Sequence, residues 1–280
     1  MKDPNRYRAL LAEQLSKLAT LRIEANDVEA SILAGREALD LYRTLAERNP
    51  DHYLHMLAIE LNNVANELAT GRSFEEALGL AQEAESIFTK LSADRPGAFA
   101  ERHARTLNSL SNRLNDLERT DEAIEASQKA VAIFRELASG NPSAFQQPLG
   151  MALHSLAYRF FEQGDTRRSL EAIDEAIVIR QHLLLTTPSA SRVALAMSSA
   201  VRASALRKAG RIEEALAEIR RSVQMLTIAA GDLGASISRE AREIGGRARK
   251  WHNEANEPLP PDLLLTLGQL TSVDEFGTTS

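Results

Sequence analysis

The sequence contains no cysteine, and aromatic residues make up only 5% of its 280 positions. Without cysteine there are no disulfides and no thiolate metal sites, which suits a reducing compartment. No apolar run approaches the ~20 residues that a membrane-spanning helix needs. The first four residues, MKDP, lack the apolar segment of a signal peptide. We therefore expect a cytoplasmic protein that does not interact with membranes.

Motifs of catalysis and cofactor binding are also missing. The chain shows no nucleophile elbow, phosphate-binding loop, zinc-hydrolase motif or dinucleotide fingerprint. Its net charge is −6, whereas general nucleic-acid binding depends on neutralising phosphates with an excess of basic residues. We expect a protein that is not an enzyme and has no cofactor, no metal and no general affinity for nucleic acid.

What the sequence does have is a repeat of 46 residues, marked by the prolines Pro4, Pro50, Pro96, Pro142 and Pro188. A fixed period of this size indicates stacked supersecondary units. In the second unit, Leu61, Val64, Ala65 and Leu68 form the apolar stripe of one helix. A turn follows at Gly71-Arg72, and Ser73 with Glu76 fits a capping box at the start of a second helix. Proline fits the boundary between units because it lacks an amide proton.

Three positions in each unit carry a small residue. The first reads Ala19, Ala65, Ser111, Ala157 and Ala203; the second reads Ser31, Ala77, Ala123, Ser169 and Ala215; the third reads Ala38, Ala84, Ala130, Ala176 and Ser222. Small residues at fixed positions indicate that helices approach closely there. We predict that Ala65, Ala84 and Ala130 are buried at helix crossings, where a larger side chain would overpack.

This pattern resembles the tetratricopeptide repeat, abbreviated TPR. The spacing of Ala65, Ala77 and Ala84 and the string Gly210-Arg211-Ile212-Glu213-Glu214-Ala215-Leu216 carry the resemblance. The period exceeds the usual ~34 residues, and the strings LNNVA at 61–65 and LNSLS at 107–111 are similar to the long repeats of the kinesin-light-chain type. The resemblance covers residues 5–230 and implies a binding scaffold with a concave groove.

We therefore predict an all-α, right-handed, TPR-type superhelical solenoid of about five helix pairs plus a C-terminal capping helix. The predicted solenoid spans 4–234, with units 5–50, 51–96, 97–142, 143–188 and 189–234. A charged capping helix is expected at 235–257 and a tail at 258–280. Within this tail we expect residues 262–270, which are rich in leucine, to dock on the protein and residues 271–280 to stay mobile.

An asparagine ladder is the first candidate site, because asparagine is a poor helix former and yet recurs here at the repeat period. By the resemblance, these positions line the groove, where amides can donate to and accept from a peptide backbone. The alternative is that they are ordinary polar surface residues. The predicted peptide-binding residues are Asn62, Asn66, Asn108, Asn112, Asn115, His154, Tyr158 and Phe161.

A basic patch is the second candidate, formed by Arg202, Arg207, Lys208 and Arg211. It suits an acidic peptide or an RNA backbone; the alternative is a solvated face neutralised by interspersed glutamates. Three functions stay open at this point: a scaffold or adaptor that binds a peptide or a partner's helix, a sensor or regulatory segment of a larger signalling protein, and a subunit associated with RNA or an enzyme through the basic end.

Overall fold

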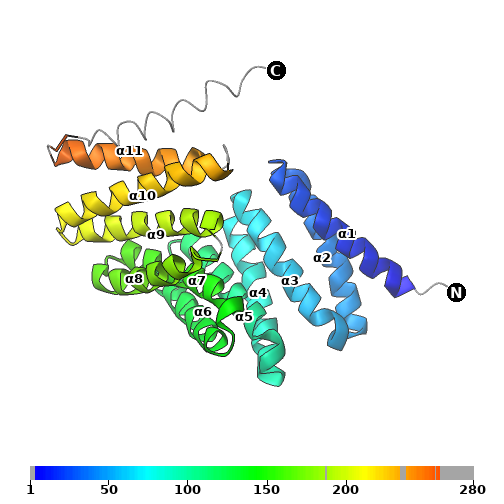
Figure 1. The fold of residues 1–280 in the computed structure, drawn as a ribbon. Coiled ribbons are helices and arrows are strands. Elements are labelled where there is room, and N and C mark those ends of the chain that lie inside the picture. The colour runs from blue at the N-terminus through cyan, green and yellow to red at the C-terminus, as the bar shows by residue number, and fades with distance from the viewer. Residues whose placement is uncertain (1–3, 187, 234–237, 256, 259–280) are drawn as a thin grey trace, which may run out of the picture. The chain divides into compact units, whose positions relative to one another are not determined.

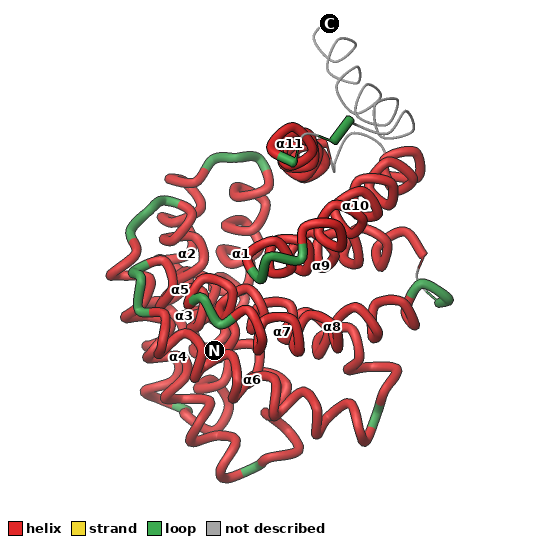
Figure 2. The backbone as a smooth tube through the Cα atoms, turned by 90° about the vertical axis from the view of Figure 1, so that its left-hand side faces the viewer, coloured by secondary structure: helices red, strands yellow, loops and turns green. Residues whose placement is uncertain are grey.

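The computed structural model describes residues 4–186, 188–233, 238–255 and 257–258. Within these ranges the chain forms eleven helices and no strand (Figures 1 and 2). Their bounds are α1 Pro4–Glu24, α2 Val28–Arg48, α3 Pro50–Thr70, α4 Phe74–Asp94, α5 Pro96–Asp116, α6 Thr120–Gly140, α7 Pro142–Gln163, α8 Thr166–Leu183, α9 Pro188–Lys208, α10 Ile212–Leu233 and α11 Ser238–Glu254. The predicted five helix pairs and a final helix are confirmed. The tail segments 262–270 and 271–280 lie outside the described residues.

The chain divides into two compact units, and each is described by itself. Unit 1 runs from Met1 to Asn141 and contains α1–α6; unit 2 begins at Pro142 and contains α7–α11. Within each unit every helix packs on the next one in the sequence. None of the helices in the described part of the chain combines the length and the apolar character that a bilayer crossing requires.

The recurring prolines are the first residues of the odd-numbered helices α1, α3, α5, α7 and α9. The first amide of a helix has no intrahelical acceptor, so proline loses nothing there, and its fixed φ angle favours the first turn. The period in the sequence is therefore the period of helix starts.

The small-residue positions are where the two helices of a pair meet. All fifteen are 0–1% exposed, including Ala65, Ala84 and Ala130, so the predicted burial is confirmed. At three joints one partner is serine, and its Oγ donates to the carbonyl oxygen of the small residue opposite: Ser31 to Ala19, Ser111 to Ala123 and Ser169 to Ala157, each at 2.8 Å. Such short distances require backbones in close approach, and each bond offsets the cost of burying the hydroxyl.

The turn inside each pair places one residue in the left-handed region, again at the period of 46. These residues are Asn26, Arg72, Glu118, Gly164 and Gly210. In the second pair the left-handed residue is Arg72, with φ 64°, while Gly71 before it has φ −75°. The glycine in the sequence therefore does not mark the strained position of that turn.

The predicted capping box at Ser73 and Glu76 is wrong in its detail. Ser73 is the N-cap of α4, but its side chain makes no capping hydrogen bond. Glu76 instead accepts from Arg36 of α2, with Arg36 Nη2 and Glu76 Oε1 2.7 Å apart. A carboxylate makes a charge-assisted hydrogen bond with either partner, and here it pairs with the cation of another helix.

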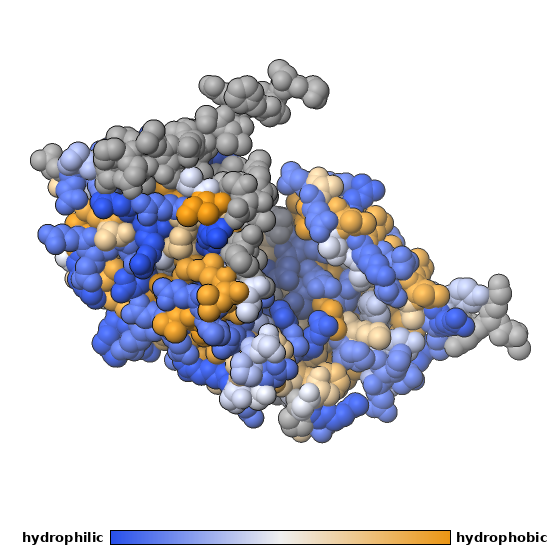
Figure 3. Space-filling model, viewed as in Figure 1, coloured by the Kyte–Doolittle hydropathy of each residue, from blue (hydrophilic) through white to orange (hydrophobic). Residues whose placement is uncertain are grey.

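The capping helix α11 has one buried face as well as a charged one. Ile244, Ala248 and Trp251 join the core that α9 and α10 form in unit 2. The opposite end of the chain differs, because α1 exposes an apolar stripe: Tyr7, Leu10, Leu11, Leu18 and Leu21. Figure 3 shows apolar side chains along α1, in the same view as Figure 1. The register-equivalent Leu57 and Val64 of α3 are buried, since α2 packs against α3.

Candidate functional site

Asn66 of the ladder connects two repeats of unit 1. Its Oδ1 accepts from Ser109 Oγ at 2.9 Å and from Arg113 Nη1 at 3.0 Å, both on α5. Its carbonyl oxygen is thus used to join α3 to α5, and the side-chain amino group is left to donate. Asn66 also lines a small hollow of about 180 Å³ with Thr20, Ile23, Asn63, Glu67 and Thr70.

Asn62 and Asn108 occupy matching positions of α3 and α5 and are half-buried. In each, the Oδ1 atom is buried and has no hydrogen-bond partner among the described residues. An unsatisfied buried acceptor costs about 1–3 kcal/mol, so these two oxygens favour a donor such as water or a peptide amide. Asn112 and Asn115 are half-buried on α5.

In unit 2 the residue at the ladder position is His154, and its ring contacts side chains of α8 and α9. His154 Nδ1 lies 3.2 Å from Ser198 Oγ and 3.4 Å from Arg180 Nη1. Burial and then the charges of Arg180 and Arg159 lower the pKa of His154 to about 3, so the ring is neutral near pH 7. His154 is thus half-buried and held by contacts within unit 2.

Arg180, which contacts His154, is a buried cation. It is 6% exposed and takes the repeat position that Phe88 and Phe134 fill in unit 1. Its Nη1 donates to the Ala194 carbonyl oxygen at 2.5 Å and also contacts Ser198 Oγ. Burial lowers the pKa of this guanidinium to about 10. No carboxylate pairs with it among the described residues, so neutral oxygens and the His154 ring solvate the charge.

Tyr158 and Phe161 lie together with two residues of the predicted basic patch. They line a pocket of about 770 Å³ formed by α7, α9 and α11. Lys208 Nζ lies 5.1 Å from the centre of the Phe161 ring and donates to the Phe161 carbonyl oxygen at 3.1 Å. The Arg207 guanidinium lies 5.1 Å from the Trp251 ring. The full lining is Tyr158, Phe161, Val201, Ser204, Arg207, Lys208, Gly246, Arg247, Lys250 and Trp251.

The other two residues of the patch are outside this pocket. Arg202 Nε contacts Asp174 Oδ1 at 2.6 Å, and its Nη1 contacts Glu218 Oε2 at 3.1 Å. Arg211 pairs with Glu214 at 2.6 Å. The patch is therefore divided in space: Arg207 and Lys208 line the pocket, and Arg202 and Arg211 do not. Arg207 also pairs with a carboxylate, that of Glu254.

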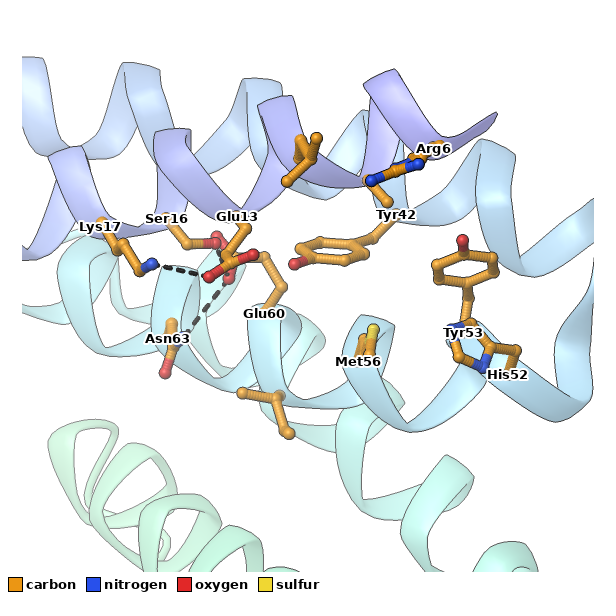
Figure 4. Close-up of a pocket in the computed structure, with 13 residues that line it drawn as sticks. Arg6, Glu13, Ser16, Lys17, Tyr42, His52, Tyr53, Met56, Glu60 and Asn63 are labelled. Atoms are coloured by element: carbon orange, nitrogen blue, oxygen red, sulfur yellow. Dashed lines mark hydrogen bonds and ion pairs between the residues drawn. The ribbon is translucent and has the colours of Figure 1, made fainter. Parts of the chain in front are cut away.

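A second pocket, not predicted from the sequence, lies in unit 1 (Figure 4). It has a volume of about 670 Å³ and lies between α1, α2 and α3. Its most unusual member is Glu60, a carboxylate that is only 2% exposed. A signal existed in the sequence, because Glu60 and Glu67 directly flank the apolar stripe of α3, where buried positions are expected.

Glu67 is the second buried carboxylate of α3, at 7% exposure. Burial and then the charge of Glu60 raise its pKa to about 7, while a bond from Ser31 acts in the opposite direction. Burial also raises the pKa of Glu60, against the effect of its bonds from Ser16 and Asn63. Unit 1 thus holds two carboxyl groups that are harder to ionise than carboxyls in water.

Comparison with known families supports the repeat. Residues 103–142 match the family model of the tetratricopeptide repeat. A search of curated proteins finds no significant match.

Solved structures resemble this one in fold. BtubC (BKLC) from P. vanneervenii is 21% identical with a TM-score of 0.65, over 80% of this chain and 83% of that one. A protein of Podosopora anserina assigned as a kinesin light chain, with nearly identical TPR-like repeats, is 16% identical with a TM-score of 0.60, over 84% and 100%. Aspartyl phosphate phosphatase F from Bacillus subtilis is 15% identical with a TM-score of 0.61; all of this chain covers 62% of that one. At these identities the likeness shows the fold.

Proposed function

We propose that this chain, a tetratricopeptide-repeat protein, is a protein–protein interaction scaffold that binds an acidic peptide segment in the α7–α9–α11 pocket of unit 2. The observation that carries the proposal is the meeting of two independently predicted groups in that pocket. Tyr158 and Phe161 come from the ladder on α7, and Arg207 and Lys208 come from the basic patch on α9.

The charges of the pocket favour an acidic ligand. Lys208 contacts a backbone carbonyl and a ring but has no carboxylate partner among the described residues. Arg207 pairs with Glu254, which is 43% exposed and easily exchanged for a ligand carboxylate. Arg247 and Lys250 add two more cations to the lining, so the pocket keeps a net positive charge.

The apolar part of the pocket favours a peptide over a small anion. The rings of Tyr158, Phe161 and Trp251 offer flat surfaces on which an apolar or aromatic side chain can pack. Aromatic and arginine residues contribute most of the binding energy at typical protein interfaces. The fitting ligand is thus a segment that combines an apolar side chain with neighbouring Asp or Glu.

Selection from a random twelve-residue phage-displayed peptide library on the full chain tests the proposal. We expect enrichment of peptides that combine Asp or Glu with an apolar residue. Arg207→Glu with Lys208→Glu should weaken the selected peptides at least tenfold, while the control Arg211→Glu, outside the pocket, should change affinity less than twofold. No enrichment, equal loss in the control, or tighter binding of poly(U) RNA than of any peptide would reject it.

The ladder carries a separate part of the proposal, in which the asparagines of unit 1 contact the backbone of a peptide that binds to unit 1. The buried, unpartnered Oδ1 atoms of Asn62 and Asn108 support it, because a peptide amide would satisfy them. Changing Asn62, Asn66, Asn108 and Asn112 to Ala should weaken capture of a natural partner at least tenfold in a folded protein. Circular dichroism checks the fold, and unchanged capture would reject this role.

A further inference from the structure

The unit 1 pocket combines apolar walls with a buried acid. Ala9 and Leu10 of α1, Tyr42 of α2, and Tyr53, Met56 and Ile59 of α3 form most of its walls. The charged residues that line it are Arg6, Glu13, Lys17 and Glu60, with His52 beside Tyr53. Figure 4 shows these side chains converging from the three helices of unit 1.

The two carboxylates differ in how well they are neutralised. Glu13 pairs with Lys17, whose Nζ lies 2.6 Å from Glu13 Oε1. Glu60 Oε2 accepts from Ser16 Oγ at 2.5 Å and from Asn63 Nδ2 at 3.3 Å. Glu60 Oε1 is buried and has no hydrogen-bond partner among the described residues. One oxygen of a buried acid is therefore left for a donor.

The ring of Tyr42 shares this part of the pocket. Figure 4 shows its hydroxyl directed toward Glu13 and Glu60, and Arg6 near the other end of the ring. Burial and then the charges of Glu60 and Glu13 raise the pKa of Tyr42, which indicates a negative field around the hydroxyl. A cation near the face of a tyrosine is stabilised further by the ring quadrupole.

We propose that this pocket binds the cationic side chain of a partner peptide, a lysine or an arginine, with its head on Glu60 and its aliphatic stem between Tyr42, Met56 and Ile59. A long basic side chain fits both parts, because its stem is apolar and only its head is charged. The head lies at the Glu60 end, where the two carboxylates Glu13 and Glu60 outnumber the cation Lys17, whereas Arg6 lies at the other end. The biological use of the site rests on the proposed scaffold function, but the binding itself does not.

The test uses small probes on the full-length protein, followed by the methyl NMR signals of Met56 and Ile59. The probes are N-acetyl-lysine-N-methylamide, its uncharged norleucine analogue and the corresponding glutamate derivative. We expect the lysine probe to bind at least fivefold more tightly than the norleucine probe. The affinity should also increase with pH, because the ionised form of Glu60 attracts the cation. Equal affinity for lysine and norleucine, or preference for glutamate, would overturn the proposal without any variant.

Glu60→Gln keeps the shape and hydrogen-bonding capacity of the side chain and removes its charge. This variant should reduce the preference for lysine over norleucine to less than twofold, whereas Glu47→Gln, an exposed control on α2, should leave it unchanged. The preference should also persist in the Arg207→Glu, Lys208→Glu protein, so failure of the unit 2 pocket and failure of this site are distinguishable. A preference that survives Glu60→Gln contradicts the assignment.

Discussion

The two units share one set of helix joints and differ in the charges that they bury. Unit 1 buries the carboxyl groups of Glu60 and Glu67, and its pocket contains an acid. Unit 2 buries the guanidinium groups of Arg159 and Arg180, and its buried carboxylate, Glu218, is paired with Arg202. Its pocket is lined by basic residues. Both units have the same helix joints because close helix packing tolerates only small residues. The difference shows that the chemistry of each unit is decided at a few positions next to the apolar stripe.

The two units also differ in the turns inside their helix pairs. The left-handed residue is Asn26, Arg72 or Glu118 in unit 1 and Gly164 or Gly210 in unit 2. A residue with a Cβ atom pays roughly 1–2 kcal/mol in this conformation, whereas glycine does not. Unit 1 therefore holds more backbone strain in its turns than unit 2 does.

The largest expected effect is on the acid stability of unit 2. Between pH 6.5 and 3 the unfolded chain binds a proton on His154 that the folded chain, with its pKa of about 3, does not bind. Stability from this group is thus complete above pH 6.5 and is lost as the pH falls toward 3, by about 3 kcal/mol between pH 7 and pH 4. Hydrogen exchange of α7–α9 should show this loss. His154→Gln should abolish it, and the exposed control His182→Gln should not.

The next effect, in unit 1, has the opposite sign. Glu67 has a folded pKa of about 7, above its ordinary value of 4.5. The folded state therefore holds the proton more tightly, and its stability is complete below pH 4.5 and is lost as the pH rises through 7. We expect a loss of about 2 kcal/mol from pH 5 to pH 8 in the exchange of α3. Glu67→Gln should reduce the loss to the part that Glu60 contributes, whereas Glu37→Gln, exposed on α2, should leave it intact. A flat wild-type profile would contradict the assignment.

Overpacking a helix joint should lower the free energy of unfolding by a similar amount in both units. Ala84 of α4 and Ala176 of α8 are both 0% exposed at the third small position. Replacing either by Leu should destabilise its unit by about 1–3 kcal/mol, because the facing helices cannot separate without losing other contacts. Urea unfolding measures the effect, with exposed Gln82→Leu as the control. A variant as stable as wild type would mean that the helices do not meet there.

The smallest effect should come from the turns. Glu118→Gly should stabilise unit 1 by about 0.5 kcal/mol, since relief of left-handed strain exceeds the added entropy of the unfolded chain. Gly164→Ala should destabilise unit 2 by about 1 kcal/mol for the converse reason. Thermal unfolding of both variants sharpens the comparison. Equal and opposite changes are not required, but a stabilising Gly164→Ala would show that the turns do not differ as described.

Much of the fold was predictable, because its signals are local and repeated. Helical geometry alone was enough to predict two of these features. They are the apolar stripe of Leu61, Val64, Ala65 and Leu68 and the proline at each helix start. The capping box at Ser73 and Glu76 was predicted wrongly, since the competing partner Arg36 comes from another helix. The residues of the ladder and the patch were identified from the sequence. That Tyr158 and Phe161 lie with Arg207 and Lys208, apart from Arg202 and Arg211, depends on how α7, α9 and α11 pack.

The sequence by itself determined the period, the helix starts and the small joints, because each depends on residues within one helix pair or on their exact recurrence at 46 positions. Tertiary structure alone decided which charged groups lost their water. In the sequence, Glu60 and Glu67 show only that they flank an apolar stripe, and Arg180 only that it replaces the Phe88 and Phe134 of other repeats. Their chemistry follows from the distance and burial that packing between helices imposes, and no periodicity along the chain contains that information.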